Sequence, residues 1–128
     1  MPPSKKRNVT LLIVEDDHMI VKALSLKFEG RYKVVEAFDG REGLRLALKD
    51  HPDLILLDLL MPNMDGITML RKLRSDPWGK KVKVMILTNL SNEDMEKEAR
   101  SLGVSSYIIK SDLQLNEVIK MIEENIFS

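Results

Sequence analysis

The sequence has 128 residues and a mass of 14.7 kDa, the size of one domain. Its apolar fraction of 44% and charged fraction of 31% exclude a disordered or low-complexity chain. The 20 basic and 20 acidic residues balance, so no net charge draws the chain to nucleic acid or to an anionic membrane. Cysteine is absent, which excludes disulfides and fits a cytoplasmic protein, and the apolar runs are too short to cross a bilayer.

Short apolar runs rich in branched residues predict the strands of a parallel sheet. Three of the runs are nearly continuous in apolar character, which is typical of strands covered on both faces. The second and fourth runs contain charges, so we expect them to lie nearer an edge or a surface. In chain order the runs are Val9–Val14, Lys33–Ala37, Leu54–Leu57, Val82–Leu87 and Ser106–Ile109.

Segments with helical spacing separate these runs, and the best apolar stripe, Leu115 to Ile126, predicts the closing helix. The segment around Met95, Ala99 and Leu102 has a thin stripe among charged residues, so we expect a weakly anchored fourth helix. Asp17 is a suitable N-cap for the first helix. Ser91, followed by an acid three residues later, resembles the capping box of the fourth helix.

The alternation of strand and helix, repeated five times, predicts a three-layer, doubly wound α/β fold with right-handed crossovers. We assign residues 1–8, which include Lys5, Lys6 and Arg7, to a basic and solvated N-terminal tail. Residues 9–127 form the predicted domain. The chain ends where the fifth helix ends, so we expect no second domain.

Polar side chains follow four of the predicted strands, where ligands gather in an open parallel sheet. Glu15 and Asp16 follow the first strand and Asp58 follows the third. Crowded carboxylates repel one another, and a hard divalent cation such as Mg²⁺ relieves that repulsion. Thr88 and Lys110, after the fourth and fifth strands, add a hydroxyl and an ammonium. Such a set suits phosphoryl transfer, with Asp58 as the candidate nucleophile that forms an acyl phosphate.

The same positions carry a resemblance to a known family. The sequence resembles the receiver domain of two-component response regulators, such as the single-domain chemotaxis receivers, from about Val9 to Ile126. That resemblance implies a flavodoxin-like (βα)5 fold with strand order 2-1-3-4-5. The D-x-x-M-P-x-M-D-G block that begins at Asp58 is highly specific. The matching segments are Val14–Asp17, Leu57–Gly66, Leu87–Thr88 and Tyr107–Lys110.

The resemblance implies a phosphoacceptor role for Asp58. Its phosphoryl group would come from a phosphohistidine on a sensor histidine kinase or a histidine phosphotransfer protein. Glu15, Asp16 and Asp58 would bind Mg²⁺ together with the backbone carbonyl of Leu60.

The resemblance also implies a switch. Lys110 would pair with Asp58 and then with the phosphoryl oxygens. Thr88 would swing its hydroxyl toward the phosphoryl group, and Tyr107 would move inward with it. These movements would reshape the surface formed by the fourth helix, the fifth strand and the fifth helix, where a partner protein would bind.

The sequence departs from the family pattern near the site. Ser111 stands where a proline commonly follows the lysine and makes a cis peptide bond, so either this bond is cis at a cost of about 3–4 kcal/mol or the loop is rearranged. Asn89 replaces a usually small residue, and its bulk could narrow access to the site. Leu60 and Leu90 are apolar at positions where polar groups accompany rapid loss of phosphate, so we expect a long-lived phosphoryl group.

Other functions stay open beside this one. The chain could be the receiver portion of a longer DNA-binding or enzymatic response regulator. An aspartate-nucleophile phosphatase usually has a second acid two residues after the nucleophile, where Leu60 lies. A flavin-binding module would need donors for phosphate after the first strand, where Glu15 and Asp16 would repel it. We therefore expect a signalling protein that catalyses only its own phosphorylation and dephosphorylation, as a monomer or a phosphorylation-dependent dimer.

Overall fold

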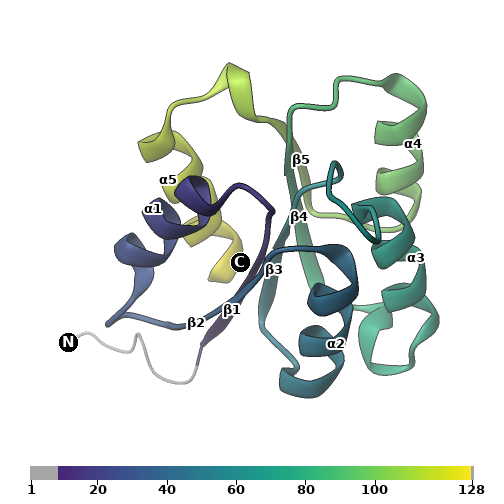
Figure 1. Cartoon of the computed structure of the whole chain (residues 1–128), viewed down its shortest axis with the longest axis horizontal. Coiled ribbons are helices and arrows are strands. Elements are labelled where there is room, and N and C mark those ends of the chain that lie inside the picture. The colour runs from purple at the N-terminus through teal and green to yellow at the C-terminus, as the bar shows by residue number, and fades with distance from the viewer. Residues whose placement is uncertain (1–8, 128) are drawn as a thin grey trace.

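The computed structural model describes residues 9–127. Five parallel strands form one sheet in the order β2-β1-β3-β4-β5. Helices α1 and α5 cover one face of this sheet, and α2, α3 and α4 cover the other (Figure 1). The predicted three-layer, flavodoxin-like fold and its strand order are therefore confirmed. The elements are β1 Thr10–Val14, α1 His18–Phe28, β2 Lys33–Ala37, α2 Gly40–Asp50, β3 Leu54–Leu57, α3 Gly66–Ser75, β4 Lys83–Thr88, α4 Glu93–Ser101, β5 Ser106–Ile109 and α5 Leu115–Ile126.

The strand bounds match the prediction closely, and the expectation from charge that the fourth run lies nearer an edge is wrong, whereas the strand order implied by the resemblance is correct. The first and fourth strands each begin one residue later than expected, and β4 ends at Thr88. As predicted, β2 lies at an edge, whereas β4 lies inside the sheet between β3 and β5. Its charge causes no conflict because Lys83 is the first residue of the strand, and the Lys83 Nζ donates a hydrogen bond to the carbonyl of Asn125 at 2.7 Å.

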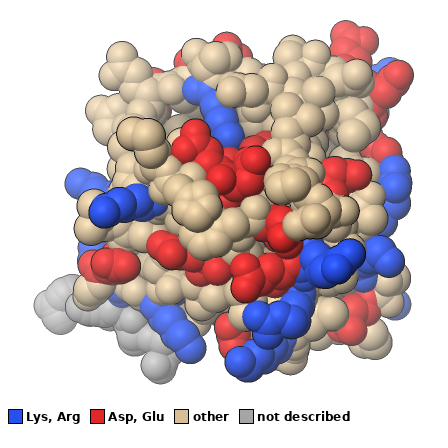
Figure 2. Space-filling model, viewed as in Figure 1, with Lys and Arg blue, Asp and Glu red and all other residues tan. Residues whose placement is uncertain are grey.

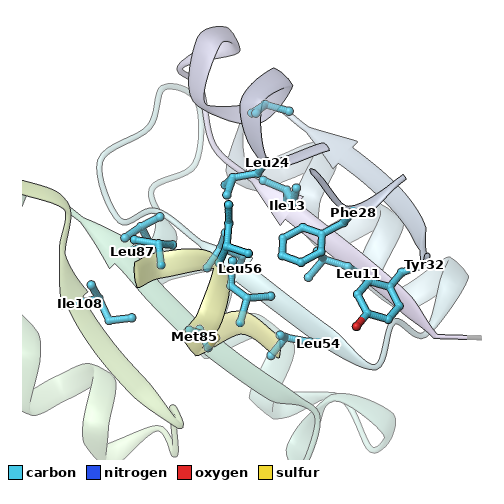
Figure 3. Close-up of a cluster of buried hydrophobic side chains, with 14 residues drawn as sticks. Leu11, Ile13, Leu24, Phe28, Tyr32, Leu54, Leu56, Met85, Leu87 and Ile108 are labelled. Carbon is cyan, nitrogen blue, oxygen red and sulfur yellow. The ribbon is translucent and has the colours of Figure 1, made fainter. Parts of the chain in front are cut away.

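Side chains of β1 alternate between two apolar layers, one on each face of the sheet. Leu11 and Ile13 pack against α1 and α5, and Leu12 and Val14 pack on the opposite face. Figure 3 shows the first layer, in which Leu11 and Ile13 lie beside Phe28 of α1. Burial on both faces explains the continuous apolar runs in the sequence.

Helix capping agrees with the sequence in α1 and differs in α4. The Asp17 carboxylate accepts a hydrogen bond from the backbone N–H of Met19 at 3.0 Å, as predicted. The predicted capping box at Ser91 is wrong, because α4 begins one residue later. There the Asn92 side chain accepts from the N–H of Met95 at 3.1 Å. Asparagine caps helices as well as serine does, and the sequence offered both residues side by side.

Helix α4 is thinly packed, as its sparse stripe predicted. Ala99 is the one residue of this fully described helix that is buried. Arg74 of α3 stabilises the C-terminal end of α4. It donates hydrogen bonds to the carbonyls of Leu102 at 2.7 Å and Gly103 at 3.2 Å. Residues 9–127 contain no helix long and apolar enough to span a bilayer.

Candidate functional site

The predicted polar residues meet at the carboxyl edge of the sheet. Glu15 and Asp58 directly follow strands β1 and β3, whose last residues, Val14 and Leu57, are paired in register. Lys110 directly follows β5. Figure 2 shows a face of the molecule on which acidic side chains gather near the middle, with a basic side chain beside them.

Three carboxylates are close enough to share one cation. Oxygen atoms of Glu15, Asp16 and Asp58 all lie within 4.8 Å of one another. Glu15 is 4% exposed and Asp58 is 5% exposed, whereas Asp16 is open to solvent. An all-oxygen set with one exposed member suits a hard divalent cation that keeps part of its water shell.

The Lys110 ammonium lies among these acids. Its Nζ is 2.6 Å from Glu15 Oε1 and 3.2 Å from Asp58 Oδ2. No peptide bond in residues 9–127 is cis, so the rearranged loop is the outcome at Ser111. The chain forms a 3₁₀ turn over Lys110–Asp112. The lysine thus reaches the site without the family's proline.

Thr88 and Tyr107 are joined through one residue of the β4–α4 loop. Thr88 is buried, and its Oγ1 accepts a hydrogen bond from the N–H of Leu90 at 3.2 Å. The half-buried Tyr107 donates its hydroxyl proton to the carbonyl of Leu90 at 2.7 Å. A displacement of this loop would therefore break or lengthen the hydrogen bonds of both side chains to Leu90.

The sequence matches a known family of signalling domains. Residues 11–123 match the model of the response regulator receiver domain. The chain belongs to this family of two-component response regulators. This receiver domain is 37% identical over 101 residues to the response regulator PleD of Caulobacter vibrioides, a match that covers 78% of this chain and 22% of that relative. The chain thus spans less than a quarter of that relative's length.

Solved structures agree with the assignment. The phosphorylated cyanobacterial phytochrome response regulator RcpA superposes with a TM-score of 0.81 and 32% identity, covering 95% of this receiver domain and 96% of that chain. The Mn²⁺-bound form of response regulator Rcp1 has a TM-score of 0.73 and 29% identity, covering 91% and 90% of the two chains. That structure contains Mn²⁺, and in this receiver domain the carboxylates of Glu15, Asp16 and Asp58 are close enough to hold a metal ion.

Burial and neighbouring charges set the protonation of the site. Burial, reinforced by the charge of Asp58, raises the pKa of Glu15 from 4.5 to about 7, despite hydrogen bonds from Lys110 and the backbone of Asp17. Burial acts to lower the pKa of Lys110, but its hydrogen bond to Glu15 and the charge of Asp58 outweigh this and raise the pKa. Burial also raises the pKa of Tyr107, helped by the negative charges of Glu96 and Asp58. Lys110 is thus charged at neutral pH.

The structure brings the sequence-predicted site residues of the receiver domain together. Asp58, Glu15, Asp16 and Lys110 form one cluster. Thr88 and Tyr107 are linked to each other through their hydrogen bonds to Leu90. Leu60 is 51% exposed, and its N–H donates to Asp58 Oδ1 at 3.2 Å.

Sequence reasoning missed the support of the loop between β3 and α3. Asn63 in this loop has a φ of 67°, and its side chain contacts Asp39 at the start of α2. The sequence does contain one sign of this loop conformation, an asparagine in the centre of the loop. Asparagine adopts the left-handed backbone conformation more readily than most residues. The distance of 24 residues between Asn63 and Asp39 concealed the partner.

Proposed function

We propose that this receiver domain accepts a phosphoryl group on Asp58. The donor is a phosphohistidine of a sensor histidine kinase or a histidine phosphotransfer protein. An Asp58 carboxylate oxygen attacks phosphorus, the N–P bond breaks, and the imidazole keeps the electron pair. The observation that supports this most strongly is the nearly buried Asp58 carboxylate beside two further acids and an ammonium. Such preorganised charge is what phosphoryl transfer needs.

The acidic residues fit Mg²⁺ as the cation of the site. Carboxylates of Glu15, Asp16 and Asp58 would hold it together with the backbone carbonyl of Leu60. When bound, the cation neutralises charge on the phosphoryl oxygens and on the carboxylates that surround them. Lys110 already contacts Asp58 and would contact the phosphoryl oxygens after transfer.

Phosphorylation would then act on the β4–α4 loop. In the proposed switch, Thr88 gives up its bond to the Leu90 N–H and turns its hydroxyl toward the phosphoryl group, and Tyr107 follows. The surface of α4, β5 and α5 changes, and a partner protein binds there. The thin packing of α4, with Ala99 as its buried anchor, supports this because a weakly anchored element moves at low cost.

The proposed activity is limited to the protein's own phosphorylation and dephosphorylation. Leu60 offers no acid to activate a leaving group or water, which supports a signalling role over a phosphatase. The chain spans 22% of its relative PleD, so we keep the alternative that it is the receiver portion of a longer response regulator. Size-exclusion chromatography with and without phosphorylation distinguishes a monomer from a phosphorylation-dependent dimer.

Intact mass spectrometry after incubation with acetyl phosphate and Mg²⁺ tests the proposal. We expect one added phosphoryl group on the wild type and none on Asp58→Asn or in the presence of a chelator. Asp94→Asn, at an exposed acid in the first turn of α4, is the matched control and should be phosphorylated normally. A modification that persists in Asp58→Asn would reject the assignment.

We also propose that the phosphoryl group is long-lived. Leu60 is half exposed beside Asp58 and presents no polar group that could orient water. Loss of phosphate should therefore be faster in Leu60→Asn than in the wild type. A wild-type half-life of seconds in Mg²⁺ would contradict this proposal.

A further inference from the structure

The loop between β3 and α3 is tied to the start of α2 by two hydrogen bonds. The Asn63 side chain donates from Nδ2 to Asp39 Oδ2 at 2.8 Å. The N–H of Gly40 donates to the carbonyl of Met64 at 3.1 Å. This loop begins directly after Asp58 and contains Leu60, so the two bonds connect the candidate phosphoryl site with a helix that contributes none of its acids.

The Asp39 carboxylate is shared between the helix and the loop. Its Oδ1 caps α2 by accepting from the N–H of Glu42 at 2.8 Å, while its Oδ2 accepts from Asn63. The hydrogen bond from Glu42 and the one from Asn63 lower the pKa of Asp39, so the acceptor is charged at neutral pH. Hydrogen bonds to a charged acceptor are stronger than neutral ones. Because the hydrogen bond from Glu42 orients the Asp39 carboxylate, the acceptor of the Asn63 hydrogen bond is held in a fixed position.

The backbone around this tether has no spare room. A Cβ atom on Gly40 would lie 2.1 Å from the carbonyl oxygen of Met64. At the other end of the loop, a Cβ atom on Gly66 would lie 2.3 Å from the carbonyl oxygen of Asp58. The loop is thus in contact with α2 at one point and with the backbone of the phosphoacceptor at another. A shift of the loop would be transmitted directly to Asp58.

We propose that Asp39 and Asn63 are positioning residues that hold the β3–α3 loop in the shape required for cation and phosphoryl binding. Asp39 supplies a fixed acceptor, and Asn63 supplies both a donor and a side chain compatible with its φ of 67°. The inference rests on the proposed function, because the Leu60 carbonyl on this loop is one of the proposed cation ligands. By reciprocity, a bound cation should strengthen the same tether and protect the first turn of α2.

Substitutions at Asn63 separate its two contributions. Asn63→Gly keeps easy access to positive φ and removes the donor, so it tests loss of the hydrogen bond without strain at positive φ. Glycine also frees the loop backbone, and the double variant described below, which keeps a side chain at position 63, separates this effect from the loss of the bond. Asn63→Asp places a carboxylate against that of Asp39 and should push the loop away. Adding Asp39→Asn to Asn63→Asp restores a donor and an acceptor with their sides exchanged, and it leaves the net charge of the wild type. Asparagine at position 39 can still cap α2.

Two measurements on these proteins decide the matter. The first is hydrogen exchange of the loop amides without a divalent cation, which should be faster in Asn63→Gly and Asn63→Asp and normal in the double variant. The second is Mg²⁺ affinity from amide chemical shifts. We expect the affinity for Mg²⁺ to be about three- to tenfold weaker in each single variant and near wild type in the double variant. This loss is at or below the lower end of the losses in metal affinity known for residues that support metal ligands. The added charge of Asn63→Asp would by itself attract Mg²⁺, so weaker binding in that variant reflects the loop.

Other results overturn the inference. It fails if the loop amides of Asn63→Gly exchange at the wild-type rate and this variant binds Mg²⁺ with the wild-type affinity. It also fails if the double variant is as weak as Asn63→Asp. A wild-type protein that binds no Mg²⁺ contradicts the proposed function instead, and the exchange comparison, which uses no cation, still decides whether Asp39 and Asn63 hold the loop.

Discussion

Replacement of Glu15 by glutamine should make the cation-free protein more stable at neutral and alkaline pH. Burial raises the pKa of Glu15 from 4.5 to about 7, so the folded protein binds this proton more tightly than the unfolded chain does. The wild-type free energy of unfolding therefore contains a favourable contribution at low pH that is lost as the pH rises from 4.5 to 7. Glutamine has the shape of the protonated acid and never ionises.

The size of the effect follows from the same pKa. A rise from 4.5 to about 7 corresponds to about 3 kcal/mol of lost stability once Glu15 is fully ionised. Glutamine keeps one acceptor oxygen in place of the two that accept from Lys110 and from the N–H of Asp17, and the lysine keeps Asp58 as a partner. We expect Glu15→Gln to be more stable than the wild type by about 2–3 kcal/mol at pH 8 and equal to it near pH 4.

Urea unfolding at a series of pH values in a chelator measures this difference. Glu124→Gln, an exposed position on α5, serves as the control and should show a small difference that does not change with pH. Addition of Mg²⁺ at pH 8 should then stabilise the wild type more than Glu15→Gln, because only the wild type keeps all three carboxylates. A variant that is less stable than the wild type at pH 8 without cation would refute the reasoning.

Three further predictions concern the scaffold. Arg74→Met should destabilise the protein by about 2–4 kcal/mol in urea unfolding, since four backbone carbonyls lose their donor; stability equal to wild type would contradict this. Asn92→Ala should cost about 1 kcal/mol in thermal unfolding while Ser91→Ala costs much less, and the reverse order would restore the capping box. Gly40→Ala should lower the melting temperature measured by circular dichroism, because its Cβ would meet Met64 at 2.1 Å, and an unchanged melting temperature would show that the loop yields freely.

The sequence predicted the sheet well because burial on both faces leaves a strong signal. Leu54–Leu57 is apolar throughout and lies as predicted in the centre of the sheet. The strand order implied by the resemblance placed β4 correctly, but its charge suggested an edge, because one lysine at the start of a strand looks the same in sequence as a lysine on an exposed edge. Its backbone acceptor at Asn125 is 42 residues away.

The sequence was enough to predict which residues form the candidate site, but not which contacts hold the surrounding loop in place. Glu15, Asp58 and Lys110 each follow a strand, so topology alone brings them to one edge. Whether Lys110 would reach the acids depended on the backbone at Ser111, where the family pattern is broken and the sequence left two alternatives. The tether at Asn63 is a contact between loops, which no periodicity marks.

Reductive trapping of the acyl phosphate tests the central claim most directly. Borohydride reduces an aspartyl phosphate to homoserine, and peptide mass spectrometry then reads the modified position in the chain. After incubation with acetyl phosphate and Mg²⁺, we predict homoserine at the position of Asp58 and at no other aspartate. Homoserine at Asp16 or elsewhere, or none in a protein that has gained a phosphoryl group, would contradict the account.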